Sequence, residues 1–178
     1  MRLGNQIVYD KRVASGRIHE NVNLVALGFL IVVYVIVRSF DQDNSLDNAL
    51  PGVAKVGFLL SYLVGTFLVT PDLDLAKNSV RAKSHWGILG LVWAPYGKMF
   101  RHRGLSHSWI LGPLTRLLYM GFIAIIFIVI AGVLTAYFGV ELRIVGRLSQ
   151  SWEPLSLGAL SGYFLSQWFH LLVDGIRP

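Results

Sequence analysis

Histidine and aspartate residues lie near the ends of the apolar stretches of this 178-residue chain, where they could bind a metal ion together. The chain contains five histidines and no cysteine. A metal site would therefore use imidazole and carboxylate ligands, and neither a disulfide nor a thiolate zinc site can form. Seven residues are the candidate metal ligands: His19, Asp72, Asp74, His102, His107, His170 and Asp174.

The pair His170 and Asp174 has the spacing of a chelating pair on a helix. Residues four apart lie on the same helical face, so both side chains can reach one ion. Gly158, Gly162 and Ser166 continue this face at the same spacing. Small residues let helices approach closely, so the pattern predicts that His170 and Asp174 point into a helical bundle.

A second stripe of small residues precedes the sequence TPDLD. Gly57, Ser61 and Gly65 are spaced by four, and Asp72 follows at the end of the same stretch. Pro71 is expected to end or kink the helix, because proline lacks an N–H and restricts the residue before it. Asp72 and Asp74 would then turn toward a common point.

The sequence FRHRGLSHSW, residues 100–109, brings two more histidines close together. His102 and His107 are five apart, which separates them by roughly 140° on a regular helix, so they can bind one ion only if the chain bends. Gly104 could allow this bend, and Ser106 is a candidate helix cap that would place His107 near a helix N-terminus.

The elements that position these residues are expected to be membrane helices. The chain is 54% hydrophobic and 15% charged, with a mean hydropathy of +0.56, which favours a bilayer over water as its solvent. A helix needs roughly 17 to 25 apolar residues to cross a membrane. Stretches of about this length predict an all-α protein of one domain, residues 1–178, with four transmembrane helices in a bundle. The four expected spans are 22–37, 53–70, 110–138 and 155–173.

One further apolar segment, residues 86–100, is too short to cross a membrane. It contains Pro95 and Gly97, and its aromatic residues include Trp86, Trp93 and Tyr96. We interpret it as an interfacial or re-entrant element on the cytoplasmic side, with these aromatic side chains at the depth of the lipid headgroups.

Basic residues set the expected orientation. The formal charge is +6, and lysine and arginine are concentrated in the amino-terminal arm and in the long loop between the second and third spans. Because cytoplasmic loops are rich in these residues, we expect a multi-pass protein of the inner (plasma) membrane with both termini in the cytoplasm. The positive charge then indicates topology and contact with membrane lipids, and no specific binding of nucleic acid is expected.

The motifs resemble those of a known family. Residues 70–119, with SGRIHE before the first span and HLLVD at 170–174, resemble a family of bacterial and cyanobacterial membrane proteins described as metal-binding proteins. More distantly, they are similar to the YdjM-like membrane-bound metal-dependent hydrolases. The resemblance implies that the seven candidate residues are metal ligands or support the ligands. It also implies one or two ions, because the His170–Asp174 pair has no further acid of the kind a cluster of three zinc ions uses.

If the hydrolase similarity holds, the ion would activate a water molecule for attack on a phosphorus or carbonyl centre. Mixed imidazole and carboxylate ligands favour zinc, although manganese and iron also fit. Asp72 or Asp74 would orient the water, and Arg103 would bind an anionic substrate. Because the site would lie near the lipid headgroups, a lipid phosphodiester or another amphiphile is the expected substrate.

Two non-catalytic alternatives use the same residues. The metal could hold the helices together as a structural site, or the protein could take part in metal transport. A transporter usually has polar groups at the centre of the bilayer. The centres of the four expected spans contain almost no charge, so transport is the less favoured alternative.

Overall fold

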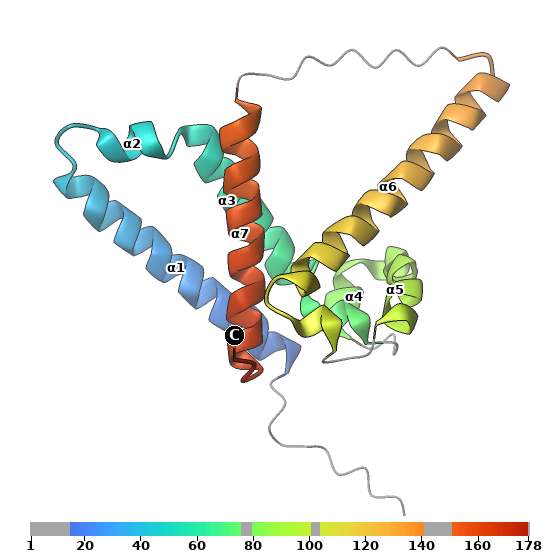
Figure 1. Cartoon of the computed structure of the whole chain (residues 1–178), viewed down its shortest axis with the longest axis horizontal. Coiled ribbons are helices and arrows are strands. Elements are labelled where there is room, and N and C mark those ends of the chain that lie inside the picture. Colours follow the sequence, from blue (N-terminus) through green and yellow to red (C-terminus); the bar gives the residue numbers. More distant parts are fainter. Residues whose placement is uncertain (1–14, 76–79, 101–103, 141–150, 178) are drawn as a thin grey trace, which may run out of the picture.

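The fold is all-helical throughout the part of the chain that the structure describes. This computed structural model describes residues 15–75, 80–100, 104–140 and 151–177, and no strand occurs in these ranges. The prediction of an all-α protein is therefore confirmed. Figure 1 shows the long helices together with the short elements that connect them. The long helices are α1 (Gly16–Phe40), α3 (Gly52–Phe67), α6 (Leu111–Tyr137) and α7 (Trp152–Val173).

The short elements connect the long helices. A single turn of helix, α2 (Ser45–Ala49), links α1 to α3. Between α3 and α6, the described residues (68–75, 80–100 and 104–110) contain five short helices. They are η1 (Pro71–Asp74), α4 (Arg81–His85), η2 (Gly87–Trp93), α5 (Ala94–Met99) and η3 (Leu105–His107).

Helices α3 and α7 pack against each other through their small residues, as the two stripes predict. A side chain on Gly158 would collide with the backbone carbonyl of Ala54, and one on Gly162 would collide with the carbonyl of Phe58. Gly57 likewise faces the backbone of Leu155 on α7. Because only glycine permits this approach, the glycines bring the carboxyl-terminal end of α7 close to the end of α3 and to Asp72.

We predict that Gly162→Leu destabilises the protein by about 1 to 3 kcal/mol, because the new side chain must force α3 and α7 apart. The measurement is thermal or denaturant unfolding of the purified protein in detergent. Gly132→Leu is the matched control, since no atom lies within 4 Å of a side chain placed at Gly132 on α6. Equal stability of the two variants would contradict this account of the α3–α7 interface.

Two of the four expected membrane spans have the length and composition of membrane helices. Helices α1 and α6 are long and apolar enough to cross a bilayer. In the most apolar window of each helix, only 11% of α1 and none of α6 is buried inside the protein. Figure 1 also shows α6 leaning away from the other long helices. A core helix of a soluble protein would be covered, so these bare apolar surfaces suit contact with lipid.

The four-span prediction is not supported for the other two helices. Helix α3 has 16 residues and ends at Phe67, three residues earlier than expected, because the chain leaves the helix before Pro71. Helix α7 has 22 residues, which is long enough, but it is not among the helices apolar enough to span. Polar side chains such as Ser166, Gln167 and His170 lie in its buried face.

The segment 86–100 does not form a spanning helix, and two of its aromatic residues are buried in the protein instead of being exposed as headgroup anchors. Trp93 and Tyr96 are completely buried, with ring centroids 5.7 Å apart, so these two side chains are not exposed for contact with lipid headgroups. They pack in one cluster with Leu73 of η1. The turns of η2 expose Ile88 and Leu91 instead. This aromatic cluster therefore supports η1, which contains Asp72 and Asp74.

Candidate metal centre

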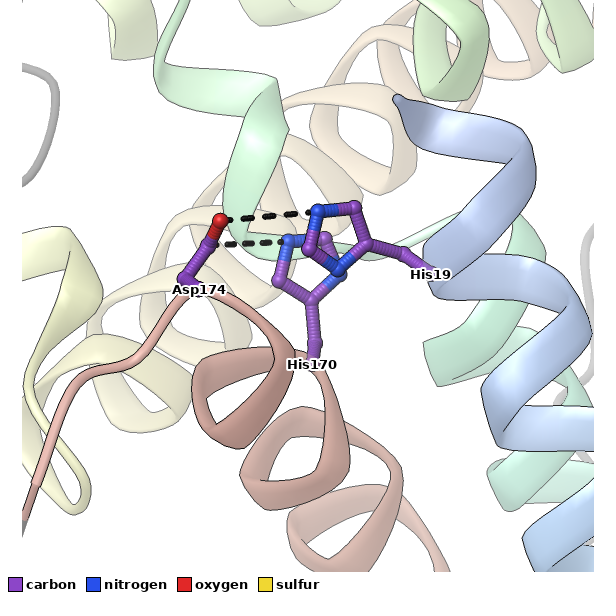
Figure 2. A group of neighbouring side chains, drawn as sticks. All are labelled: His19, His170 and Asp174. Atoms are coloured by element: carbon purple, nitrogen blue, oxygen red, sulfur yellow. Dashed lines mark ion pairs between the residues drawn. The ribbon is translucent and has the colours of Figure 1, made fainter. Parts of the chain in front are cut away.

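Four separate segments bring six of the seven candidate residues to one end of the helices. His102, the seventh, and Arg103 lie outside the described residues. His170 and Asp174 lie at the carboxyl-terminal end of α7, and His19 lies near the start of α1 (Figure 2). The segments η1 and η3 contribute the others. We call the following set the His/Asp cluster: His19, Asp72, Asp74, His107, His170 and Asp174.

Asp174 is the carboxylate that the three histidines of the His/Asp cluster share. Its Oδ1 lies 3.5 Å from Nε2 of His19, and its Oδ2 lies 3.5 Å from Nε2 of His170. Figure 2 shows both imidazoles directed toward this carboxylate. Nε2 of His107 is 3.8 Å from the same Oδ2. The Asp174 side chain is 5% exposed, so these groups meet in a nearly dry environment.

The end of α7 holds Asp174 in helical register with His170. The backbone N–H of Asp174 donates to the carbonyl of His170 at 3.1 Å, which keeps both side chains on one face as their spacing predicts. Gly175 follows with φ of +72°, a left-handed conformation that favours glycine and ends the helix. The rings of His170 and His19 stack with centroids 3.8 Å apart and an angle of 8° between their planes.

Asp74 lies on the opposite side of the His107 ring from Asp174. Its Oδ2 is 3.1 Å from Nδ1 of His107 and also accepts a hydrogen bond from the hydroxyl of Ser106. A carboxylate in this position orients an imidazole so that the other ring nitrogen can bind a metal. The geometry therefore suits Asp74 to holding His107 in place, whereas the sequence suggested a ligand or a group that orients water.

The donor atoms of the His/Asp cluster fit a divalent ion. Ligand atoms of His19, His170 and Asp174 lie within 4.8 Å of one another, and so do those of Asp72, His107 and His170. His170 belongs to both groups, and its buried Nε2 has no hydrogen-bond partner among the described residues. Buried polar atoms normally have a partner, so this nitrogen has the character of a metal ligand. Imidazole nitrogen and carboxylate oxygen suit zinc, manganese and iron.

Asp72 is ionised at neutral pH and so is able to bind a cation. Burial by itself would raise the pKa of this carboxyl group, but the adjacent His170 imidazole, together with His19 and His107, outweighs burial and lowers the pKa below its usual value. Nε2 of His170 is 3.6 Å from Oδ1 of Asp72. The Asp72 side chain is 17% exposed, more than any other carboxylate of the His/Asp cluster, so it lies at the solvent side.

The sequence suggested that Ser106 caps the helix that follows it, but it does not. Its hydroxyl donates a hydrogen bond to Asp74, and His107 belongs to η3 rather than to α6. Instead, the hydroxyl of Ser108 accepts a hydrogen bond of 2.8 Å from the backbone N–H of Gly112. The expected turn after Gly104 does occur, and it lets His107 face Asp74 and Asp174.

Arg116 positions η3, although it was not among the residues expected from the sequence. Arg116 is completely buried near the base of α6. Its guanidinium donates to the carbonyl of Ser106 at 2.7 Å and to Oε1 of Gln167 on α7 at 2.9 Å. These bonds tie the residue before His107 to the helix that contains His170. An arginine within an apolar stretch was the available signal, because such residues are costly and tend to be functional.

We predict that Arg116→Met destabilises the protein by about 2 to 4 kcal/mol, because the carbonyl of Ser106 and the amide of Gln167 would be buried without their partner. Denaturant unfolding in detergent measures the effect. Arg116→Lys retains the charge but not the planar pair of donors, so it should fall between wild type and Arg116→Met. If Arg116→Met matches wild type in stability, these bonds do not position η3.

Comparison with known proteins agrees with the chemistry of the cluster. A family described as "Uncharacterized metal-binding protein (DUF2227)" matches residues 14–178, a range that contains the whole His/Asp cluster. A protein described as "Uncharacterized protein" from Aquifex aeolicus (strain VF5) is 38% identical over 66 residues. The matched part is 37% of this chain and 45% of that protein, so the match spans less than half of the relative. No solved structure matches.

Proposed function

This chain belongs to the uncharacterized metal-binding protein family (DUF2227), and we propose that it is a membrane protein that uses a divalent ion, held by the His/Asp cluster, to hydrolyse a phosphate ester. The observation that carries the proposal is the convergence of three imidazoles on the buried carboxylate of Asp174. A group of this composition, brought together from four segments, costs folding energy unless a cation compensates the buried carboxylates.

We assign a different role to each part of the cluster. His19, His107, His170 and Asp174 would hold one or two ions, with zinc favoured and manganese or iron as alternatives, and Asp72 would act on water beside them. Asp74 would orient His107. We also propose His102 as a further ligand and Arg103 as an anion-binding residue; both lie outside the described residues.

The proposed reaction needs a group that orients a water molecule and accepts its proton, and we assign this role to Asp72. Asp72, His19 and His170 line a partly open pocket of about 10 Å³, which has room for about one water molecule. When bound, a divalent ion would acidify water and stabilise negative charge on the substrate. The ionised Asp72 would orient a water in this pocket and accept its proton. Asp74 is less suited, because its carboxylate already contacts Ser106 and His107.

The location of the cluster favours a substrate at the membrane surface. His19 lies near the start of α1 and His107 lies just before α6, so the cluster is at one end of both apolar helices. We propose that this end faces the cytoplasm, that the protein is a multi-pass protein of the inner membrane, and that both termini are cytoplasmic. A lipid phosphodiester or a related amphiphile is then the proposed substrate.

A structural metal site is the second candidate, and one observation favours it. The cluster joins α1, η1, η3 and α7, which are distant in sequence, so an ion there would hold the helices together. A structural ion is usually enclosed by protein ligands, whereas a catalytic ion keeps a position open to water. The pocket beside Asp72 favours the catalytic role.

The test is hydrolysis by the full chain in detergent, loaded with zinc or manganese and assayed on a soluble phosphodiester and on a short-chain phospholipid. We expect turnover that a chelator removes and added metal restores. Asp72→Asn should reduce kcat by about 100-fold or more, within the range for loss of a general base. Asp43→Asn serves as the matched control, because Asp43 lies in the exposed loop after α1 and not in the His/Asp cluster. A metal-loaded protein without hydrolysis on either substrate class would favour the structural site.

A further inference from the structure

The pocket beside the His/Asp cluster is also lined by residues that the proposed metal chemistry does not use. Three residues of the cluster line it, His19, Asp72 and His170, and Thr70 and Arg81 line it as well. The pocket is the size of about one oxygen atom or water molecule. A larger ligand would therefore place one oxygen inside and its remaining atoms at the mouth.

Arg81 is held at this pocket by a buried carboxylate. Its Nε donates to Glu20 at 2.6 Å, and Glu20 also contacts Nε2 of His85 at 2.9 Å. The Glu20 side chain is 9% exposed, while that of Arg81 is 38% exposed. The structure gives the terminal Nη groups of Arg81 no hydrogen bond to any described residue. The guanidinium is therefore oriented through one edge and has donors left for an anion.

Thr70 supplies an independent indication of a ligand. It is 5% exposed, and its hydroxyl has no hydrogen-bond partner among the described residues. A buried hydroxyl without a partner costs free energy, so it normally faces a water molecule or a ligand. Because Thr70 lines the same pocket as Arg81, a single oxyanion could satisfy both side chains.

We propose that Arg81 and Thr70 form a phosphoryl-binding subsite, in which both side chains donate hydrogen bonds to the phosphoryl oxygens of the substrate. The fork of an arginine matches phosphate geometry. This inference rests on the proposed metal site, because Glu20 and the carboxylates of the cluster would repel an anion unless a cation is bound. It identifies the substrate class as phosphoryl compounds, either a free phosphate or a lipid headgroup.

The experiment measures binding of inorganic phosphate to the metal-loaded full chain by calorimetry, together with metal content. We expect Arg81→Gln to weaken phosphate binding about 10- to 100-fold, which is typical for loss of a charge-assisted hydrogen bond, with unchanged metal content. Arg81→Lys should recover part of the affinity. Thr70→Val should weaken binding several-fold, and Thr70→Ser should bind nearly as well as wild type. Arg17→Gln is the control, because Arg17 is exposed and does not line the pocket.

A second arm uses dihexanoyl phosphatidic acid to distinguish the two sources of phosphate. A lipid source predicts tighter binding than inorganic phosphate, and a free phosphate predicts equal or weaker binding; Arg81→Gln must weaken both. Equal phosphate affinity in wild type and Arg81→Gln overturns the subsite, as does a metal-loaded wild-type protein that binds neither probe. Absence of metal from wild type instead overturns the proposed function, and the subsite fails with it.

Discussion

Asp174→Asn is expected to reduce the metal content of the purified protein by more than about tenfold. Asp174 is the residue whose carboxylate adjoins His19, His107 and His170, at 3.5, 3.8 and 3.5 Å. The amide has nearly the same shape but no negative charge, so the substitution removes a ligand and the compensation of the ion's charge with little change in packing. Metal analysis of protein purified from zinc- or manganese-supplemented cells measures the loss.

Two comparisons make this result specific. Asp43→Asn, in the exposed loop after α1, and His85→Ala should both retain metal at the wild-type level. Asp74→Asn should retain metal at saturating concentrations but bind it about 10- to 100-fold more weakly, because Asp74 orients His107. Full metal content in Asp174→Asn would rule out a metal site built around Asp174. Complete loss of metal in Asp74→Asn would indicate that Asp74 is a direct ligand.

Removing the metal with a chelator is expected to lower the free energy of unfolding by about 3 to 4 kcal/mol, measured with free metal at about 100 to 1,000 times the dissociation constant. The reason is that the ion binds the folded protein, in which α1, η1, η3 and α7 meet, and not the unfolded chain. Thermal unfolding with and without chelator, followed by restoration of metal, measures this difference.

The stabilisation that the metal provides should also depend on pH. Ligands must be deprotonated to bind metal, so the stabilisation by metal should decrease as the pH is made more acidic. Gly162→Leu provides the contrast, because its loss of stability comes from helix packing and should be the same with and without metal. If chelation leaves stability unchanged while it removes bound metal, the site contributes little to the fold, and the catalytic role becomes the stronger candidate.

The sequence was sufficient for features that depend on local helix geometry. The spacing of His170 and Asp174 predicts a shared face, because a helix returns to the same side after four residues. The glycines at 158 and 162 predict close packing of α7 for the same reason, and α3 is its partner in the structure. The absence of cysteine restricts the metal ligands to histidine and carboxylates. None of these inferences requires knowledge of which segments meet in space.

The sequence could not give the contacts between distant segments. The separation of Asp74 from Asp72, with Asp74 behind His107, depends on how η1 and η3 meet. Trp93 and Tyr96 are of the residue types that often anchor at lipid headgroups, but they are buried in one cluster with Leu73. Likewise, an apolar stretch shows that a helix is favourable in lipid but does not show where it ends. Pro71 and the polar face of α7 therefore left two of the four expected spans unsupported.

The division follows from the range of the interactions involved. Periodic patterns report the geometry of one helix, and that geometry is the same in every protein. The orientation of each imidazole depends instead on several weak contacts from other segments, such as the bond from Arg116 to Ser106 and the stacking of His19 on His170. The residue types of the metal centre were therefore determined by the sequence alone, whereas only the tertiary structure decided which atoms face one another.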